Sequence, residues 1–341
     1  MTAEELRERL ERFIARAAGA SDVCVEGLHK LPGGASRETW SFDAAYTHDG
    51  AAVRLPLVLR RDPGSTTLNT QRREEFRVQA AAFADGLPVP RPFWLAEDAD
   101  ALGAPSYVMQ RVDGETLARR LLRDEAYAPA RAVMTGQLGA ILARIHRIDI
   151  VRHELDFLPA PLPGDSPALA ELDRYEQTFR GVAPEPHPAF ELAFRWLRRR
   201  LPIGGRRALV HGDYRIGNVI FGPEGVRAIL DWELAHIGDP MADLGWICTN
   251  CWRFGAVDKP VGGCGQREDL WEGYEAAGGD KVDRTHALFW ELFGSLRWGV
   301  MCAGMIPAFH AGESVERGVI ARRASENEVD LMRLLDGKGA A

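Results

Sequence analysis

Two side chains that offer hard oxygen atoms lie at the ends of an expected β-hairpin. Apolar residues at 219–221 and 226–230 flank a Pro/Gly turn centred on Glu224-Gly225, which is typical of two short antiparallel strands. In a hairpin with this centre, Asn218 and Asp231 oppose each other with their Cβ atoms about 5 Å apart. Mg²⁺ prefers oxygen ligands and keeps water or phosphate oxygens in its other positions, so the pair predicts a magnesium site.

A carboxylate and a guanidinium precede this pair, in the loop that enters the hairpin. Asp213 stands where a carboxylate can accept the proton of an attacking hydroxyl group. Arg215 would place a cation beside a phosphoryl group during its transfer. Together with the expected metal pair, these residue types predict phosphoryl transfer to a hydroxyl group.

The elements that must carry these residues change character near residue 112. Period-2 patterns and turn residues predict antiparallel strands and one helix in the first part of the chain, at 23–31, 39–45, 55–60, 70–84 (the helix) and 106–110. From residue 113 the apolar periodicity is mostly helical, with further short strands expected at 208–210 and in the hairpin. We therefore expect a small antiparallel-sheet lobe followed by a larger, mainly helical lobe.

An amphipathic helix is expected over residues 1–20. Thr2 and Glu5 have the spacing of a capping box. Apolar side chains then recur at helical spacing among charged residues, at Leu6, Leu10, Phe13, Ile14 and Ala17. This pattern predicts a helix that packs one face on the body of the protein.

Residues 159–188 are rich in proline, which indicates loops around a short helical piece that carries Tyr175 and Phe179. We interpret this segment as an insertion that could cover a substrate. A helix is expected to follow at 191–200.

The composition excludes several classes of partner. The chain has 341 residues with 49 acidic and 42 basic side chains, a net charge of −7, so it has no electrostatic footprint for nucleic acid. No run approaches the roughly 18 apolar residues of a membrane span. Five cysteines without a signal peptide favour a reducing, cytoplasmic compartment. Oligomeric state is left open.

The central motif resembles a known group of enzymes. His-x-Asp-x-x-x-x-Asn, followed by a strand pair and an Asp, resembles the catalytic loop and metal-binding Asp of protein kinases. Its His-Gly-Asp form, with Leu-Asp-Trp-Glu at 230–233, is similar to the aminoglycoside phosphotransferase and choline kinase superfamily. The resemblance implies a protein-kinase-like two-lobed α+β fold, with ATP bound by residues 21–112 and the catalytic and substrate-binding lobe at 113–341.

The same resemblance implies a role for each residue. Asp213 would be the catalytic base, Asn218 and Asp231 would hold Mg²⁺, and His211 would orient the loop. The alternative is that these are turn and cap residues. Asp239 and Asp243, farther along, stand where a helix starts and are expected to cap it. In the family, the residue at the position of Asp243 supports the catalytic loop by hydrogen bonding.

The nucleotide side carries weaker signals. Gly33, Gly34 and Ser36 join two expected strands and could lay backbone N–H groups over phosphates. Tyr107 to Val112 fit the hinge between the lobes, where backbone groups of Gln110 and Val112 could contact adenine.

One position departs from the kinase pattern. Kinases place a Lys on the third strand, and this chain has Arg60 there, whose guanidinium can grip phosphate. Glu75 is its expected partner, with Glu74 as the competing candidate. The alternative is that Arg60 is a solvated charge at a strand end. The replacement also motivates a different hypothesis, a catalytically silent nucleotide-binding protein of the same shape.

The acceptor is suggested by the branch of the superfamily that this chain resembles. Val-Leu-Arg-Arg at 58–61 and Pro-Val-Pro-Arg-Pro at 88–92 mark a branch that includes kinase-like domains fused to acyl-CoA dehydrogenases in animals. The resemblance implies a small-molecule hydroxyl substrate, such as a hydroxyacyl-CoA. The alternative is an aminoglycoside or another amino-alcohol or sugar. Aromatic residues near the C-terminal end, including Phe289, Trp290 and Phe293, are expected in the core rather than in a pocket.

Overall fold

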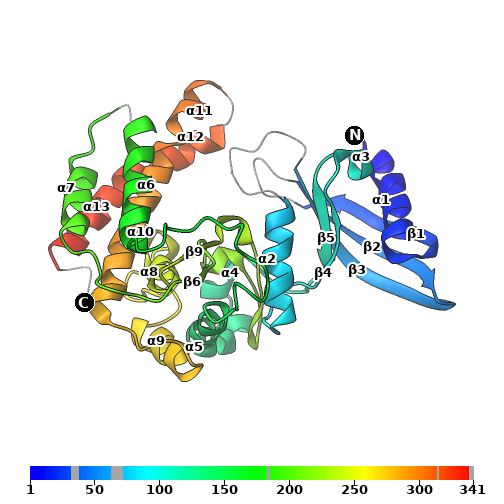
Figure 1. The fold of residues 1–341 in the computed structure, drawn as a ribbon, viewed down its shortest axis with the longest axis horizontal. Coiled ribbons are helices and arrows are strands. Elements are labelled where there is room, and N and C mark those ends of the chain that lie inside the picture. Colours follow the sequence, from blue (N-terminus) through cyan, green and yellow to red (C-terminus); the bar gives the residue numbers. More distant parts are fainter. Residues whose placement is uncertain (32–37, 63–71, 183–184, 313–314, 338–341) are drawn as a thin grey trace. The chain divides into compact units, whose positions relative to one another are not determined.

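The computed structural model describes residues 1–31, 38–62, 72–182, 185–312 and 315–337. The chain forms two compact units, which Figure 1 shows as ribbons. The sheet unit comprises residues 1–114 and 227–234, and the helical unit comprises residues 115–226 and 235–341. The division of the chain into lobes at residue 112 stays a prediction of domain organisation.

The sheet unit is built on five antiparallel strands in the order β1-β2-β3-β5-β4. Its elements are α1 (Ala3–Ala18), β1 (Ser21–Lys30), β2 (Glu38–His48), β3 (Ala51–Arg61), α2 (Arg72–Ala84), β4 (Pro92–Ala96), α3 (Ala99–Leu102) and β5 (Ser106–Gln110). The predicted strands are confirmed to within four residues at each end, and the helix over 70–84 is confirmed from residue 72, since residues 70 and 71 lie outside the described residues. Strand β4 was not predicted, because it begins at a proline, which is tolerated at the first residue of an edge strand.

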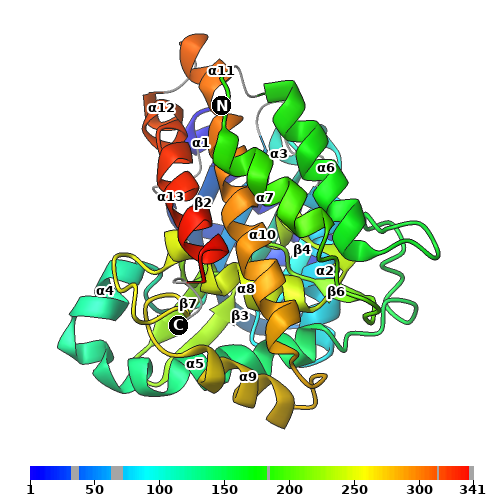
Figure 2. The same ribbon diagram turned by 90° about the vertical axis from the view of Figure 1, so that its left-hand side faces the viewer.

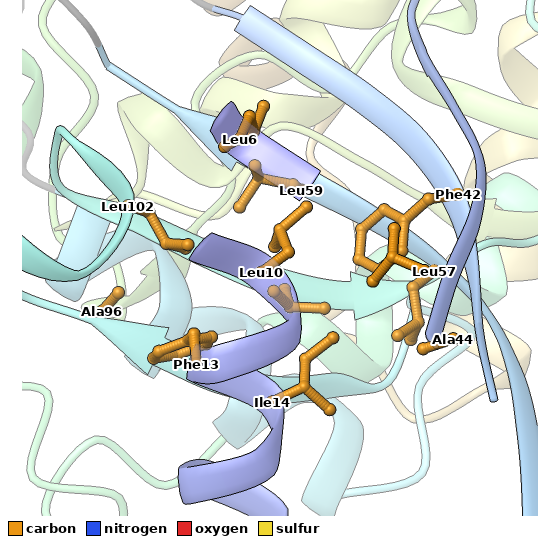
Figure 3. Close-up of a cluster of buried hydrophobic side chains, with 12 residues drawn as sticks. Leu6, Leu10, Phe13, Ile14, Phe42, Ala44, Leu57, Leu59, Ala96 and Leu102 are labelled. Atoms are coloured by element: carbon orange, nitrogen blue, oxygen red, sulfur yellow. The ribbon is translucent and has the colours of Figure 1, made fainter. Parts of the chain in front are cut away.

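Helix α1 packs on this sheet, as its pattern predicted. Thr2 and Glu5 form the capping box, and Gly19 closes the helix in the left-handed conformation at φ 58°. The apolar face of α1 lies against side chains of β2, β3 and β5 in one buried cluster that Figure 3 draws, which includes Leu6, Leu10, Phe13, Ile14, Phe42, Leu57, Leu59 and Val108. This burial holds α1 on the sheet whose strand β3 carries Arg60.

From residue 115 onward the chain is mostly helical. Its elements are α4 (Ala118–Arg123), η1 (Glu125–Tyr127), α5 (Ala128–Ile145), α6 (Pro167–Val182), α7 (Pro188–Arg198), β6 (Ala208–Val210), η2 (Ile216–Asn218), β7 (Val219–Gly222), β8 (Gly225–Ile229), η3 (Trp232–Leu234), β9 (His236–Gly238), α8 (Met241–Cys248), η4 (Asn250–Trp252), α9 (Arg267–Ala276), α10 (Arg284–Ala303), α11 (Ile306–His310), α12 (Val315–Ala321) and α13 (Ala324–Leu335).

Helix α10 is the centre of the helical unit. It packs against α6, α7, α8 and α13, and Figure 2 shows it running beside α7 and α13. The contact with α8 is close because Gly245 has no side chain: a Cβ there would lie 2.5 Å from the backbone carbon of Trp290. Phe289, Trp290 and Phe293 of α10 are buried, which confirms that they belong to the core.

One local prediction needs correction, and one strand was not predicted. The segment at 159–188 contains the 16-residue helix α6 rather than a short helical piece, and Tyr175 and Phe179 are buried on it. Pro167 stands at the start of this helix, where its missing N–H has no helical partner to lose, so the proline does not interrupt it. Strand β9 was not predicted, since three residues are too few to show a pattern; it pairs antiparallel with β6.

One segment of the described chain has the length and apolarity of a membrane-spanning helix, at Arg284–His310. Its most apolar window is 61% buried inside the unit. This is the property of a core helix.

Candidate active site

A buried carboxylate on α8 holds the loop that follows β6. The loop turns at Gly212, whose φ of 81° favours glycine. Asp243 accepts hydrogen bonds from the backbone N–H groups of His211 and Gly212, at 2.8 and 2.9 Å. The supporting contact that the family resemblance implied for Asp243 is therefore present. Asp239 accepts from the N–H of Met241, the first residue of α8, at 2.9 Å, although the N-cap position itself is Pro240. Asp243 lies inside α8, so its expected capping role is wrong.

Asp243 is ionised in spite of its burial. Burial favours the neutral acid, but the hydrogen bond and charge of His146, together with His211, outweigh it and hold the pKa of Asp243 below its usual range. His146 Nε2 lies 3.1 Å from the Asp243 carboxylate, and its Nδ1 lies 3.0 Å from the Tyr274 hydroxyl. The loop is thus anchored through a chain of buried polar groups.

The structure brings Asp213, Arg215 and Asn218 into direct contact. Asn218 donates its amide N–H to the Asp213 Oδ2 at 2.6 Å and to the Asp213 carbonyl at 2.9 Å. Arg215 Nε lies 3.1 Å from both carboxylate oxygens. Trp246 Nε1 donates to Oδ1 at 2.9 Å. Asp213 is only 8% exposed, and three donors hold its carboxylate in one orientation.

Sequence reasoning missed Trp246. Its only signal was its place three residues after Asp243, within an apolar run that also fits a buried helix. An indole in such a run is usually a core residue, so the pattern could not assign its N–H to Asp213.

His211 is fully buried beneath the loop. Its Nδ1 accepts a hydrogen bond from the Asp213 N–H at 3.2 Å, and its ring meets the Tyr214 ring edge-on at 5.6 Å. The Tyr214 hydroxyl donates to the Leu138 carbonyl at 3.1 Å. This setting suits a residue that orients the loop, which stays a prediction.

The hairpin turn lies one residue earlier than predicted. Strands β7 and β8 leave Pro223 and Glu224 as a two-residue turn, so its centre is not Glu224-Gly225. Asn218 ends η2 just before β7, and Asp231 follows β8. Asn218 belongs to the helical unit and Asp231 to the sheet unit, and their joint metal binding stays a prediction.

The chemistry of the predicted metal ligands, Asn218 and Asp231, can be compared with the preferences of Mg²⁺. The Asn218 amide nitrogen donates twice to Asp213, so its amide oxygen is the group that could bind a cation. Among the described residues no cluster of three or more His, Cys, Asp or Glu side chains could hold a metal ion. Mg²⁺ fits an oxygen pair of this kind, since it takes one or two protein ligands and completes its shell with water and phosphate.

On the sheet unit, Arg60 lies between two carboxylates. Its guanidinium contacts Glu75 at 3.0 Å and Asp231 at 2.8 Å. The Arg60 side chain is only 14% exposed, so the interpretation of a solvated charge at a strand end is wrong. Burial disfavours the cation, but the negative charges of Glu75 and Asp231 keep the pKa of Arg60 well above its usual value.

Glu75, rather than Glu74, is the partner that Arg60 contacts. Its side chain is 1% exposed and also accepts from the Tyr107 hydroxyl at 2.9 Å and from Arg72. Burial and the charge of Glu75 hold the pKa of Tyr107 well above its usual value, so this hydroxyl stays a donor. The contact between strand β3 and helix α2 that kinases build around a Lys is built here around an Arg.

One backbone group of the expected hinge already forms a hydrogen bond with a neighbouring strand segment. The Gln110 N–H donates to the Arg91 carbonyl at 2.8 Å, which leaves the Gln110 carbonyl, rather than its N–H, as the candidate for adenine. Val112 is half-buried directly beyond β5. Gly33, Gly34 and Ser36 lie outside the described residues.

Comparisons with known proteins identify the family of this chain. The model of the phosphotransferase enzyme family (APH) matches residues 30–282. Acyl-CoA dehydrogenase family member 10 of Mus musculus is 34% identical over 246 residues, covering 70% of this chain and 23% of that protein. Family member 11 of Homo sapiens is 32% identical over 196 residues, covering 55% of this chain and 24% of that protein. The chain spans about a quarter of the length of these curated relatives.

Solved structures show the same fold. One is the crystal structure of a protein from Ralstonia eutropha described as an aminoglycoside phosphotransferase. It superposes with a TM-score of 0.76 at 22% identity, covering 97% of this chain and 98% of that one. Aminoglycoside phosphotransferase APH(4)-Ia, in a ternary complex with AMP-PNP and hygromycin B, gives a TM-score of 0.59 at 18% identity, covering 95% and 98%. The predicted protein-kinase-like α+β fold is confirmed.

The family model covers most of the chain, including the His211 loop and the residues that hold it. The chain therefore belongs to the phosphotransferase enzyme family, small-molecule kinases that act on hydroxyl groups.

Proposed function

We propose that this chain transfers the γ-phosphate of ATP to a hydroxyl group of a small molecule, with Mg²⁺ as cofactor. The observation that carries the proposal is the Asp213 carboxylate, which three donors hold in one orientation within a loop anchored by Asp243. A general base must be positioned before its basicity matters, and this carboxylate is positioned. A silent binding protein would have no use for such an arrangement.

In the proposed reaction, the acceptor oxygen forms a bond to the γ-phosphorus while the bond from that phosphorus to the β,γ-bridging oxygen breaks. The hydroxyl proton passes to the Asp213 carboxylate, and ADP leaves with the bridging oxygen. Arg215, which now lies beside both carboxylate oxygens, is the cation available to the transferred group.

Asn218 and Asp231 would hold the Mg²⁺ ion, which supplies positive charge to the phosphate oxygens when bound. His211 would keep the loop in shape. These roles rest on the sequence motif, and the fixed orientation of the Asn218 amide supports the first of them.

The nucleotide would be held by the sheet unit. Arg60, kept in place by Glu75, is the proposed phosphate contact, and backbone groups of Gln110 and Val112 are the proposed adenine contacts. Gly33, Gly34 and Ser36 are the proposed loop over the phosphates. The similar APH(4)-Ia structure holds AMP-PNP, which supports ATP as the donor here.

We propose a hydroxyacyl-CoA-like molecule as the acceptor, in the cytoplasm. The support is the similarity to two acyl-CoA dehydrogenase family members, together with the near balance of charges over residues 252–341, 14 acidic against 11 basic side chains, which does not favour a polycation. The second candidate is an aminoglycoside or another amino alcohol, which the hygromycin B complex of a structural neighbour favours.

The test is phosphate transfer from ATP with Mg²⁺ to a mixed panel of hydroxyacyl-CoAs, aminoglycosides, choline and amino sugars, read by mass spectrometry. We expect one class to gain a single phosphoryl group. Phosphorylation of the aminoglycosides alone would replace the proposed acceptor with the second candidate. ATP binding without any phosphorylated product across the panel would contradict the kinase proposal.

A further inference from the structure

One tryptophan of the helical unit contacts the proposed base. Trp246 on α8 is 2% exposed, and its indole N–H donates to the Asp213 Oδ1 at 2.9 Å. The buried indole nitrogens of Trp252, Trp271, Trp290 and Trp298 have no hydrogen-bond partner among the described residues. Burial alone therefore does not give an indole in this unit a partner, and the bond to Asp213 is specific to Trp246.

The ring of Trp246 is fixed from several sides. The Arg297 guanidinium lies 4.2 Å from its ring centroid, and Trp252 meets it edge-on at 5.3 Å. Gly294 of α10 leaves room for the ring, because a Cβ there would lie 3.4 Å from the Trp246 Cε3 atom and 2.4 Å from the Thr249 Oγ1 atom. These contacts hold the indole N–H on the line to Asp213.

Arg297, which also interacts electrostatically with Glu171, is buried beside Trp246. It is 6% exposed and its buried Nε has no hydrogen-bond partner among the described residues. Its recorded ring contacts are Trp246 and, at 5.5 Å, Tyr175. A cation over the face of an indole is attracted by the ring, and it draws electron density from the ring that carries the N–H. Arg297 thus both holds Trp246 and strengthens it as a donor.

We propose that Trp246 is a positioning residue for phosphoryl transfer, which sets the plane of the Asp213 carboxylate through its indole N–H and is itself held by Arg297. The inference rests on the proposed function. Asn218 holds Oδ2 and Trp246 holds Oδ1, so together they fix both oxygens. Without the indole N–H, the carboxylate can rotate toward Arg215, and fewer acceptor molecules meet it in the reactive geometry.

The experiment compares Trp246→Phe with Trp290→Phe, assayed on the acceptor that the panel identifies. Both changes remove a buried indole from neighbouring helices, but only the first removes a donor to Asp213. Hydrogen bonds to charged groups are among the stronger ones, so we expect kcat to fall about 10- to 100-fold in Trp246→Phe, with the KM for ATP unchanged. Trp290→Phe should lower kcat less than about three-fold.

A double-mutant cycle with Asp213→Asn separates positioning from general damage. If Trp246 acts through Asp213, Trp246→Phe should lower the residual rate of Asp213→Asn less than about three-fold. A full 10-fold or greater loss in both backgrounds, or equal kcat values for Trp246→Phe and Trp290→Phe, would overturn the proposal.

Arg297→Met is the second variant, for use if Trp246→Phe does not melt cooperatively. We expect a fall in kcat of about 3- to 10-fold that disappears in the Asp213→Asn background. An unchanged kcat would overturn the proposal. Failure of the proposed function is a separate result, since it would appear as absence of transfer by the unmodified chain.

Discussion

Arg60 offers a sharp test of how the sheet unit is held together. Replacing it with Met keeps the length of the side chain but removes the cation that lies between Glu75 and Asp231. Breaking a buried ion pair by removing one partner costs about 3–5 kcal/mol. Asp231 is 25% exposed, and Glu75 keeps Arg72 and Tyr107, so both carboxylates retain some stabilisation. We therefore expect a loss of about 2–4 kcal/mol in the free energy of unfolding.

Arg54→Met is the matched control, because Arg54 lies on the same strand and also contacts two carboxylates, Glu26 at 2.8 Å and Asp43 at 3.2 Å. Its side chain is 60% exposed, so water screens these pairs and the expected loss in unfolding free energy is much smaller than that for Arg60→Met. Urea unfolding at constant m-value measures both variants.

Arg60→Met should also raise the KM for ATP at least ten-fold, whereas Arg54→Met should leave it unchanged. Arg60→Lys keeps a cation but reaches fewer oxygens, so it should fall between wild type and Arg60→Met. Equal unfolding free energies for Arg60→Met and Arg54→Met, within about 0.5 kcal/mol, would refute the reasoning from burial.

Three further outcomes follow from contacts in the helical unit. The pKa of Asp243 is lowered in the folded chain, so its contribution to stability is complete above about pH 5 and is lost as the pH falls through and below about 4. Asp243→Asn should therefore flatten this part of a profile of melting temperature against pH, and an unchanged slope would contradict the role given to Asp243. Glu291→Ala leaves Arg253 and Arg267 buried without their shared carboxylate and should lower the unfolding free energy by about 3–5 kcal/mol in urea, where a loss below about 1 kcal/mol would contradict the reasoning. Gly139→Ala should lower the unfolding free energy by about 1–3 kcal/mol, because its Cβ would lie 2.1 Å from the Leu270 carbonyl oxygen. Gly136→Ala, with open space around it, should be neutral or stabilising, and equal melting temperatures for the two variants would show that α5 and α9 can separate.

The sequence predicted the features that depend on residues close together in the chain. The capping box at Thr2 and the apolar face of α1 lie within one helix, and both are present. The contact of Arg60 with Glu75 was also predictable, because it follows from one motif and from the helix that comes after the strand. Asp213, Arg215 and Asn218 were expected to lie close together because they stand within six consecutive residues of one loop.

What could not be predicted depends on residues far apart in the chain or on one position of register. The strand bounds leave Pro223 and Glu224 as the turn instead of centring it on Glu224-Gly225, and composition does not distinguish the two. Trp246 donates to Asp213, which lies 33 residues away in sequence, and nothing in the local pattern distinguishes its indole from a core tryptophan. The contact of Arg60 with Asp231 joins residues 171 apart and has no local signal.

The central claim is that Asp213 acts as the base of a phosphoryl transfer. The most direct measurement follows release of ADP together with formation of the phosphorylated acceptor, for the unmodified chain and for Asp213→Asn, with ATP binding measured in parallel. The account predicts equal amounts of ADP and product for the unmodified chain, and a rate at least 1,000-fold lower for the variant with ATP binding retained. Transfer by Asp213→Asn at a rate close to that of the unmodified chain would contradict it.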